Sequence, residues 1–92
     1  MPVNIRAILR EEDIEGLIAL GAPEDEYDFE GQEIELAVSR LDKRDEDDLV
    51  HVIEKVWRKF FELGAEDIAL RRDAFRRAAR RILTGTQRGG QV

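Results

Sequence analysis

The chain has 92 residues, of which 42% are hydrophobic and 39% charged, and its formal net charge is -6. These values fit one soluble globular domain and exclude a disordered chain. No Cys is present, which excludes disulfides, thiolate metal sites and a Cys nucleophile. Because no apolar run approaches the roughly 18 residues of a membrane span, and the start lacks a signal-peptide core, we expect a cytoplasmic protein.

Two short apolar groups near the start of the chain are out of helical phase with each other. They are Ile5, Ile8 and Leu9 in the first group, and Ile14, Leu17 and Ile18 in the second. One straight helix cannot bury both groups, so we expect a break within residues 11–13. Asn4 is the expected N-cap of the first helix, and Asp13 is expected to cap a second short turn that stops at Gly21 and Pro23.

Residues 11–33 form a strongly acidic segment with ten acids and no Lys or Arg. Its middle, residues 21–28, is named the acidic loop; it surrounds Tyr27 and has too little apolar content to fold alone. We expect Pro23 to close the loop, and the Tyr27 ring to pack on the core with its hydroxyl in water. The acids do not follow the ligand spacing of an EF-hand, so no metal site is predicted.

Residues 30–41 and 46–63 each predict a helix with one apolar face, joined by a charged linker at 42–45. The first helix is expected to bury Ile34, Ala37, Val38 and Leu41, with Phe29 and Leu36 off that face. The second has acids in its first turn, which the helix dipole favours, and Gly64 is expected to end it in the left-handed conformation. Its apolar stripe comprises Leu49, Val52, Ile53, Val56, Trp57, Phe60 and Leu63.

The last helix is predicted over residues 71–83, with a connection at 64–70 because Leu70 misses the helical phase. It is expected to bury Phe75, Ala78, Ala79 and Ile82. Residues 85–92 are Gly-rich and predict a flexible tail after a single domain at 1–84. The fold class is therefore all-α: a compact bundle of about four helices, with short N-terminal helices and two longer C-terminal helices.

The last helix also carries a basic face, since residues 71–88 hold seven Arg against one acid, Asp73. The residues that could contact nucleic acid are Arg72, Arg76, Arg77, Arg80 and Arg81. However, the chain has no helix-turn-helix spacing, no aromatic stacking platform and no net positive charge. A solvated face, partly neutralised by the acidic segment, is the other interpretation.

Catalytic chemistry has few candidate groups in this sequence. The only Ser is Ser39 and the only His is His51, which falls on the polar side of its helix, and their spacing supports no nucleophile–base pair. We therefore predict that the protein is not an enzyme and has no cofactor. A further group of large apolar residues could complete the core or form an interface: Phe29, Leu36, Trp57 and Phe61.

Several segments of the chain resemble the YugE-like family of small bacterial proteins of unknown function. The resemblance covers about residues 5–83 and rests on 8–13 (ILREED), 21–28 (GAPEDEYD), Ile34, 49–57 (LVHVIEKVW) and 75–83. The family tends to have a Trp-Asp-Pro turn after its first helix, where this chain has Glu12-Asp13-Ile14. The resemblance implies an all-helical protein with no assigned activity or cofactor.

These observations favour a non-enzymatic module that binds another protein, in an immunity or antitoxin-like role where an acidic surface neutralises a basic toxin. The predicted contact residues are Glu24, Asp25, Glu26, Tyr27 and Asp28. Nucleic-acid binding through the Arg face is the alternative. We further expect the acidic segment to lie beside the Arg helix, which favours a monomer; poles that face apart would instead give a weak, salt-sensitive homodimer.

Overall fold

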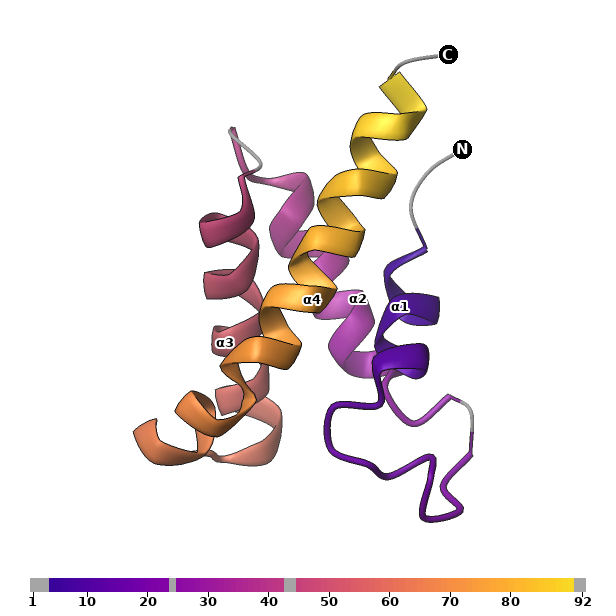
Figure 1. Ribbon diagram of the computed structural model, residues 1–92, viewed down its shortest axis with the longest axis vertical. Coiled ribbons are helices and arrows are strands. Elements are labelled where there is room, and N and C mark those ends of the chain that lie inside the picture. The colour runs from indigo at the N-terminus through magenta and orange to yellow at the C-terminus, as the bar shows by residue number, and fades with distance from the viewer. Residues whose placement is uncertain (1–3, 24, 43–44, 91–92) are drawn as a thin grey trace.

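The structure is a computed structural model that describes residues 4–23, 25–42 and 45–90, and in this part of the chain it contains helices and no strands. The helices are α1 (Ile5–Glu12), α2 (Asp28–Ser39), α3 (Glu46–Phe61) and α4 (Ala65–Gly90). They close into a ring of contacts in which α1 packs on α2, α2 on α3, α3 on α4 and α4 on α1 (Figure 1). The prediction of an all-α bundle is confirmed.

The break after the first helix is confirmed, and Asp13 caps the turn that follows it, as predicted. Asn4 caps α1 as expected, since its side chain accepts a hydrogen bond from the backbone N–H of Ala7 at 3.0 Å. Asp13 also ends α1 in the left-handed conformation, with φ of 44°, while its carboxylate accepts from the backbone N–H groups of Ile18 and Ala19 in the turn. Residues 14–21 are turns whose apolar side chains Ile14, Leu17 and Ile18 lie half-buried against the core.

Helix α2 begins two residues earlier than predicted and ends two residues earlier, at Ser39. Ile34 and Val38 are buried, whereas Phe29 and Leu36 are exposed, as the helical phase predicted. Gly31 allows α2 to lie close to α1, because a Cβ at this position would be only 2.8 Å from the Cγ of Arg6. This close approach brings the start of α2 against the N-terminal helix.

Helix α3 is capped by Asp45, whose side chain accepts from the backbone N–H of Asp48 at 2.8 Å, and it carries three acids in its first turn. Its end differs from the prediction: Glu62, with φ of 53°, is the left-handed C-cap. Gly64 instead precedes α4, and its carbonyl accepts from the backbone N–H of Ile68 at 3.1 Å. Phe60, predicted to be buried, is 38% exposed.

Helix α4 is much longer than the predicted 71–83, because it starts at Ala65 and continues to Gly90. The predicted connection at 64–70 is therefore wrong. Leu70 missed the helical phase because it lies on the exposed side of α4, whereas Ile68, two residues before it, is fully buried. The flexibility of a tail at 85–92 stays a prediction; its residues 91 and 92 lie outside the described residues.

The core is centred on Trp57, whose side chain is fully buried between the helices. Its ring lies 6.0 Å from that of Tyr27, 5.3 Å from that of Phe61 and 5.8 Å from that of Phe75, measured between centroids. Aromatic pairs at these separations stabilise a core beyond the area they bury. Trp57 is thus core, and Phe61 is packed partly buried against it.

Candidate functional site

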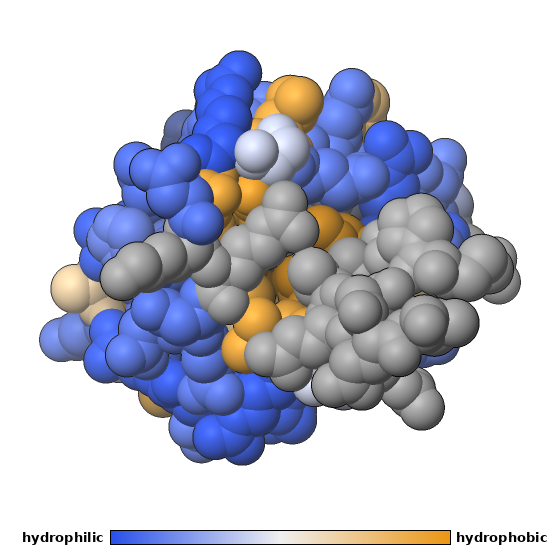
Figure 2. Space-filling model, turned by 90° about the horizontal axis from the view of Figure 1, so that it is seen from above, coloured by the Kyte–Doolittle hydropathy of each residue, from blue (hydrophilic) through white to orange (hydrophobic). Residues whose placement is uncertain are grey.

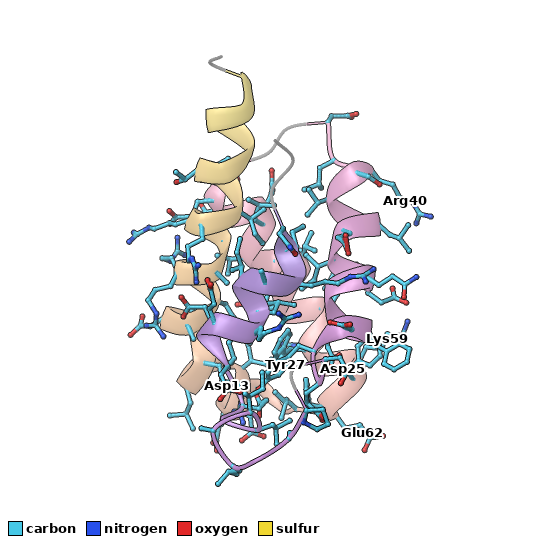
Figure 3. The ribbon with its side chains drawn as sticks, turned by 90° about the vertical axis from the view of Figure 1, so that its right-hand side faces the viewer. Asp13, Asp25, Tyr27, Arg40, Lys59 and Glu62 are labelled. Carbon is cyan, nitrogen blue, oxygen red and sulfur yellow. The ribbon has the colours of Figure 1, made fainter. Side chains whose placement is uncertain are left out.

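The acidic loop is anchored to the core through Tyr27, which is fully buried (Figure 3). The Tyr27 hydroxyl donates to Oδ1 of Asp13 at 2.6 Å and accepts from the backbone N–H of Glu15 at 3.2 Å. The hydroxyl is thus inside the protein and not in water as predicted. Tyr27 holds the loop in place, so the structure removes it from the predicted contact surface.

The pKa values of Asp13 and Tyr27 are shifted in opposite directions by the hydrogen bond between them. Burial raises the pKa of the Tyr27 phenol, and the Asp13 carboxylate raises it further. The hydrogen bond from Tyr27 lowers the pKa of Asp13, as do bonds from the backbone N–H groups of Ile18 and Ala19, at 3.1 and 3.0 Å. A neutral phenol therefore donates to a carboxylate that also holds the turn at 14–21 in place.

The other predicted contact residues of the acidic loop face outward. Asp25 and Glu26 are exposed and Asp28 is half-buried, whereas Glu24 lies outside the described residues. In the described part of the chain, the ion pairs involve none of these three carboxylates. Their negative charge is therefore free to attract a basic group from another molecule.

Behind the loop, Glu30 is a buried carboxylate that the sequence pattern did not reveal. Only 6% of the residue is exposed, and it takes part in no ion pair of the described residues. Burial raises the pKa of Glu30, and the nearby negative charges of Glu26 and Asp28 add to the effect. A buried unpaired carboxylate at this place opposes folding at neutral pH.

Glu30→Gln is accordingly expected to raise the midpoint of thermal unfolding at pH 7. The folded-state pKa of Glu30 lies above its unfolded value, so the wild type regains stability as pH falls and the carboxyl takes up its proton. The advantage of the variant should therefore shrink toward pH 4.5. Circular dichroism melts at several pH values measure this, with the exposed Glu66→Gln as the control. A lower midpoint for Glu30→Gln at pH 7 would contradict the assignment.

The predicted nucleic-acid face is extensively ion-paired within the molecule. Its contacts are Arg72 with Glu54, Arg76 with Glu46 and Asp47, Arg77 with Glu12, Arg80 with Glu46, and Arg81 with Glu11 and Glu12. The hydrogen bonds from Arg80 and Arg76 lower the pKa of Glu46. A phosphate would have to compete with a carboxylate at all five guanidinium groups. The first residues of the acidic segment do lie beside the Arg helix, where Glu11 pairs with Arg81 and Glu12 with Arg77.

A second internal polar cluster, which the sequence did not reveal, joins the turn at 14–21 to α3 and α4. Glu15 accepts from Nε1 of Trp57 and from a terminal guanidinium nitrogen of Arg71, each at 2.8 Å. Arg71 also donates to the backbone carbonyl of Asp67 at 2.9 Å. The hydrogen bond from Arg71 lowers the pKa of Glu15 more than burial raises it, and Trp57 lowers it further. The one sequence signal for this cluster was Trp57 itself, because the N–H of a buried Trp needs a hydrogen-bond acceptor.

The outer side of α2 lies next to the acidic loop and carries two exposed large apolar side chains. This surface, named the α2 face, consists of Phe29, Gln32, Glu33, Leu36 and Arg40. Phe29 is 71% exposed and Leu36 is 49% exposed. The four residues thought to be either core or interface are thus divided, with Trp57 and Phe61 in or against the core and Phe29 and Leu36 on the surface.

Two hollows lie between neighbouring helices. One of about 260 Å³ lies between α2 and α3 and is lined by Glu33, Ala37, Val52, Lys55, Val56 and Lys59. The other, of about 330 Å³, lies between α1 and α4 and includes Ile8, Arg80 and Arg81. Figure 2 shows the end of the bundle to which α4 runs, with hydrophobic residues visible near the middle inside a hydrophilic surround.

Comparisons with protein-family models, with curated proteins and with solved structures give no significant match for the chain. The YugE-like resemblance therefore stays a hypothesis. Within the described ranges, no helix combines the length and apolarity of a membrane span. Across the same residues, no group of three or more His, Asp or Glu side chains is arranged to hold a metal ion. His51 is exposed as predicted, and the Ser39 hydroxyl donates to the carbonyl of Leu36 at 2.7 Å.

Proposed function

We propose that this chain is a non-enzymatic protein-binding module, and that its binding surface is formed by the acidic loop and the α2 face. The observation that supports this most is the distribution of free charge. The described acids Asp25, Glu26 and Asp28 have no ionic partner, whereas the Arg face on α4 is satisfied by carboxylates of the same chain. Negative charge at the acidic loop is therefore left to attract a partner.

The exposed Phe29 ring lies directly after these acids in the chain and supplies the apolar part of such a contact. Interfaces commonly have an aromatic anchor at the centre with charged groups around it. Phe29 is 71% exposed, and three of the four residues before it are acidic. The partner that fits is a protein with a basic rim around an apolar patch. A basic toxin or nuclease has this chemistry, which is the immunity or antitoxin-like form of the proposal.

A capture experiment with matched charge changes tests this function. The tagged protein, an Asp25→Lys/Glu26→Lys variant and an Asp73→Lys/Glu66→Lys control are incubated with a lysate of the source organism at low salt. The control changes the same net charge at exposed positions on α4. We expect a partner that the wild type and the control retain and the loop variant loses. Equal retention by the loop variant, or no retained protein at all, would contradict the proposal.

Nucleic-acid binding through Arg72, Arg76, Arg77, Arg80 and Arg81 is the weaker alternative. It needs those groups to leave their carboxylate partners, and the exchange costs part of the binding free energy. If it occurs, affinity should fall steeply with salt on a log–log plot. A flat binding isotherm with mixed DNA and RNA at low salt would eliminate it.

A further inference from the structure

We propose that the α2 face binds the α2 face of a second copy of this chain, with the two helices antiparallel about a two-fold axis. This inference rests on the proposed function, since it names a partner for the same surface. The apolar part of the contact comes from Phe29 and Leu36. They are seven residues apart, which is about two helical turns, so they lie on one side of α2 about 10 Å apart along its axis.

The pairing of these two side chains follows from their positions on the helix. When two copies of α2 run antiparallel about the midpoint between Phe29 and Leu36, each Phe29 meets the Leu36 of the other copy. Phe29 is 71% exposed and Leu36 is 49% exposed, so each has surface to bury. A two-fold interface requires one patch to be complementary to itself, and this spacing meets the requirement.

The charges at the two ends of α2 fit the same register. Asp25 lies in the turn just before α2, and Arg40 directly follows the last residue of α2. The antiparallel arrangement that sets Phe29 against Leu36 therefore brings the acidic turn of each copy toward Arg40 of the other copy. Figure 3 shows Asp25 and Arg40 toward opposite ends of α2. Both side chains are exposed, and neither takes part in an ion pair with another described residue.

The middle of the face does not oppose this arrangement. Its one charged residue, Glu33, is compensated within the chain by Lys59, with 3.4 Å between the carboxylate oxygen and Nζ. In the antiparallel register Glu33 meets the uncharged Gln32 of the second copy. The dipoles of the two α2 helices also oppose each other, which is the favourable orientation for adjacent helices.

The α2 face carries both halves of its own complement, because the acidic turn lies at one end of the apolar pair and Arg40 at the other. A second copy therefore matches it in charge as well as in apolar contact. The expected monomer was based on neutralisation of the Arg helix by the acidic segment, which involves α1 and α4 and does not reach the α2 face.

Sedimentation velocity of the purified full chain, from micromolar to about millimolar concentration, tests the inference. We expect a monomer–dimer equilibrium that Leu36→Asp weakens at least tenfold. The control is Leu70→Asp, because Leu70 is 83% exposed but lies on α4, and it should leave the equilibrium unchanged. A wild type that stays monomeric throughout, or a dimer that Leu36→Asp does not affect, would overturn the inference.

The register is tested by exchanging the two end charges. Arg40→Asp alone and Asp25→Arg alone each set like charges against each other and should weaken the dimer about two- to fivefold, the range of exposed ion pairs. The double variant Asp25→Arg/Arg40→Asp should restore it, because each exchanged pair is again of opposite charge. Singles that weaken the dimer without restoration in the double variant would overturn the antiparallel register.

Failure of this inference can be told apart from failure of the proposed function. A monomeric wild type whose capture of a partner depends on Asp25 and Glu26 would sink the second-copy assignment and leave the function standing. A dimer with the predicted register that captures no other protein would support the assignment and contradict the binding of a different partner.

Discussion

Trp57→Ala is expected to lower the free energy of unfolding by about 3–5 kcal/mol, the range for removing a large buried aromatic side chain. Trp57 is fully buried and contacts the rings of Tyr27, Phe61 and Phe75. Its truncation leaves a cavity between α3, α4 and the acidic loop. It also removes the indole N–H that donates to Glu15, which leaves Arg71 as the side-chain donor to Glu15 among the described residues.

Urea unfolding followed by circular dichroism measures the Trp57→Ala effect, since the variant has no Trp for fluorescence. Trp57→Phe helps to separate the two contributions, because it removes the hydrogen bond but only part of the buried ring volume. Phe60→Ala is the matched control on the same helix, at a residue that is 38% exposed. A loss below about 1 kcal/mol for Trp57→Ala would place the side chain outside the core and contradict the structure.

Asp13→Ala is expected to cost about 2–4 kcal/mol through two effects. It removes the acceptor of the buried Tyr27 hydroxyl, of the part-buried N–H of Ile18 and of the exposed N–H of Ala19, and a buried donor left without an acceptor costs about 1–3 kcal/mol. It also places Ala at a φ of 44°, where a residue with a plain Cβ is strained by about 1–2 kcal/mol.

Thermal and urea unfolding of Asp13→Ala and Asp13→Asn measure these two effects separately. Asn tolerates the left-handed conformation and keeps one acceptor oxygen, so its loss should be smaller. Because the folded-state pKa of Asp13 is lowered, the stability that its carboxylate contributes is present above pH 3.8, the ordinary pKa, and is lost as pH falls below this value. The difference in unfolding free energy between wild type and Asp13→Ala should therefore become smaller at low pH. Equal losses for Ala and Asn would contradict the assigned cap.

The sequence predicted best the parts of the fold that depend on local periodicity. The broad apolar stripe of α3 and the break after α1 are both present, since each depends on residues a few positions apart. The start of α4 was missed because one exposed Leu, Leu70, was read as a break in phase, while the buried Ile68 carried the true pattern. The left-handed C-cap of α3 is Glu62 and not the expected Gly64, because α3 ends at Phe61.

The candidate site depends on contacts between residues far apart in the sequence, which local helical periodicity cannot predict. Tyr27 meets Asp13 across 14 residues, and Trp57 meets Glu15 across 42, so both pairs require the helices to be assembled first. The charge imbalance between the two ends of the chain was visible in the sequence. The sequence did not show which acids form ion pairs within the molecule. Asp25 and Glu26 are left on the surface without an ionic partner among the described residues.

The ion pairs between α1 and α4 join residues that are synthesised far apart in time. Arg77 bonds to Glu12, 65 residues earlier, and Arg81 bonds to Glu11, 70 residues earlier. Helix α1 has eight residues, too few to be stable alone in water. During translation α1 therefore cannot form these ion pairs until α4 has emerged. Truncation within α4 should consequently destabilise α1 first, because it removes the ion-pair partners of Glu11 and Glu12.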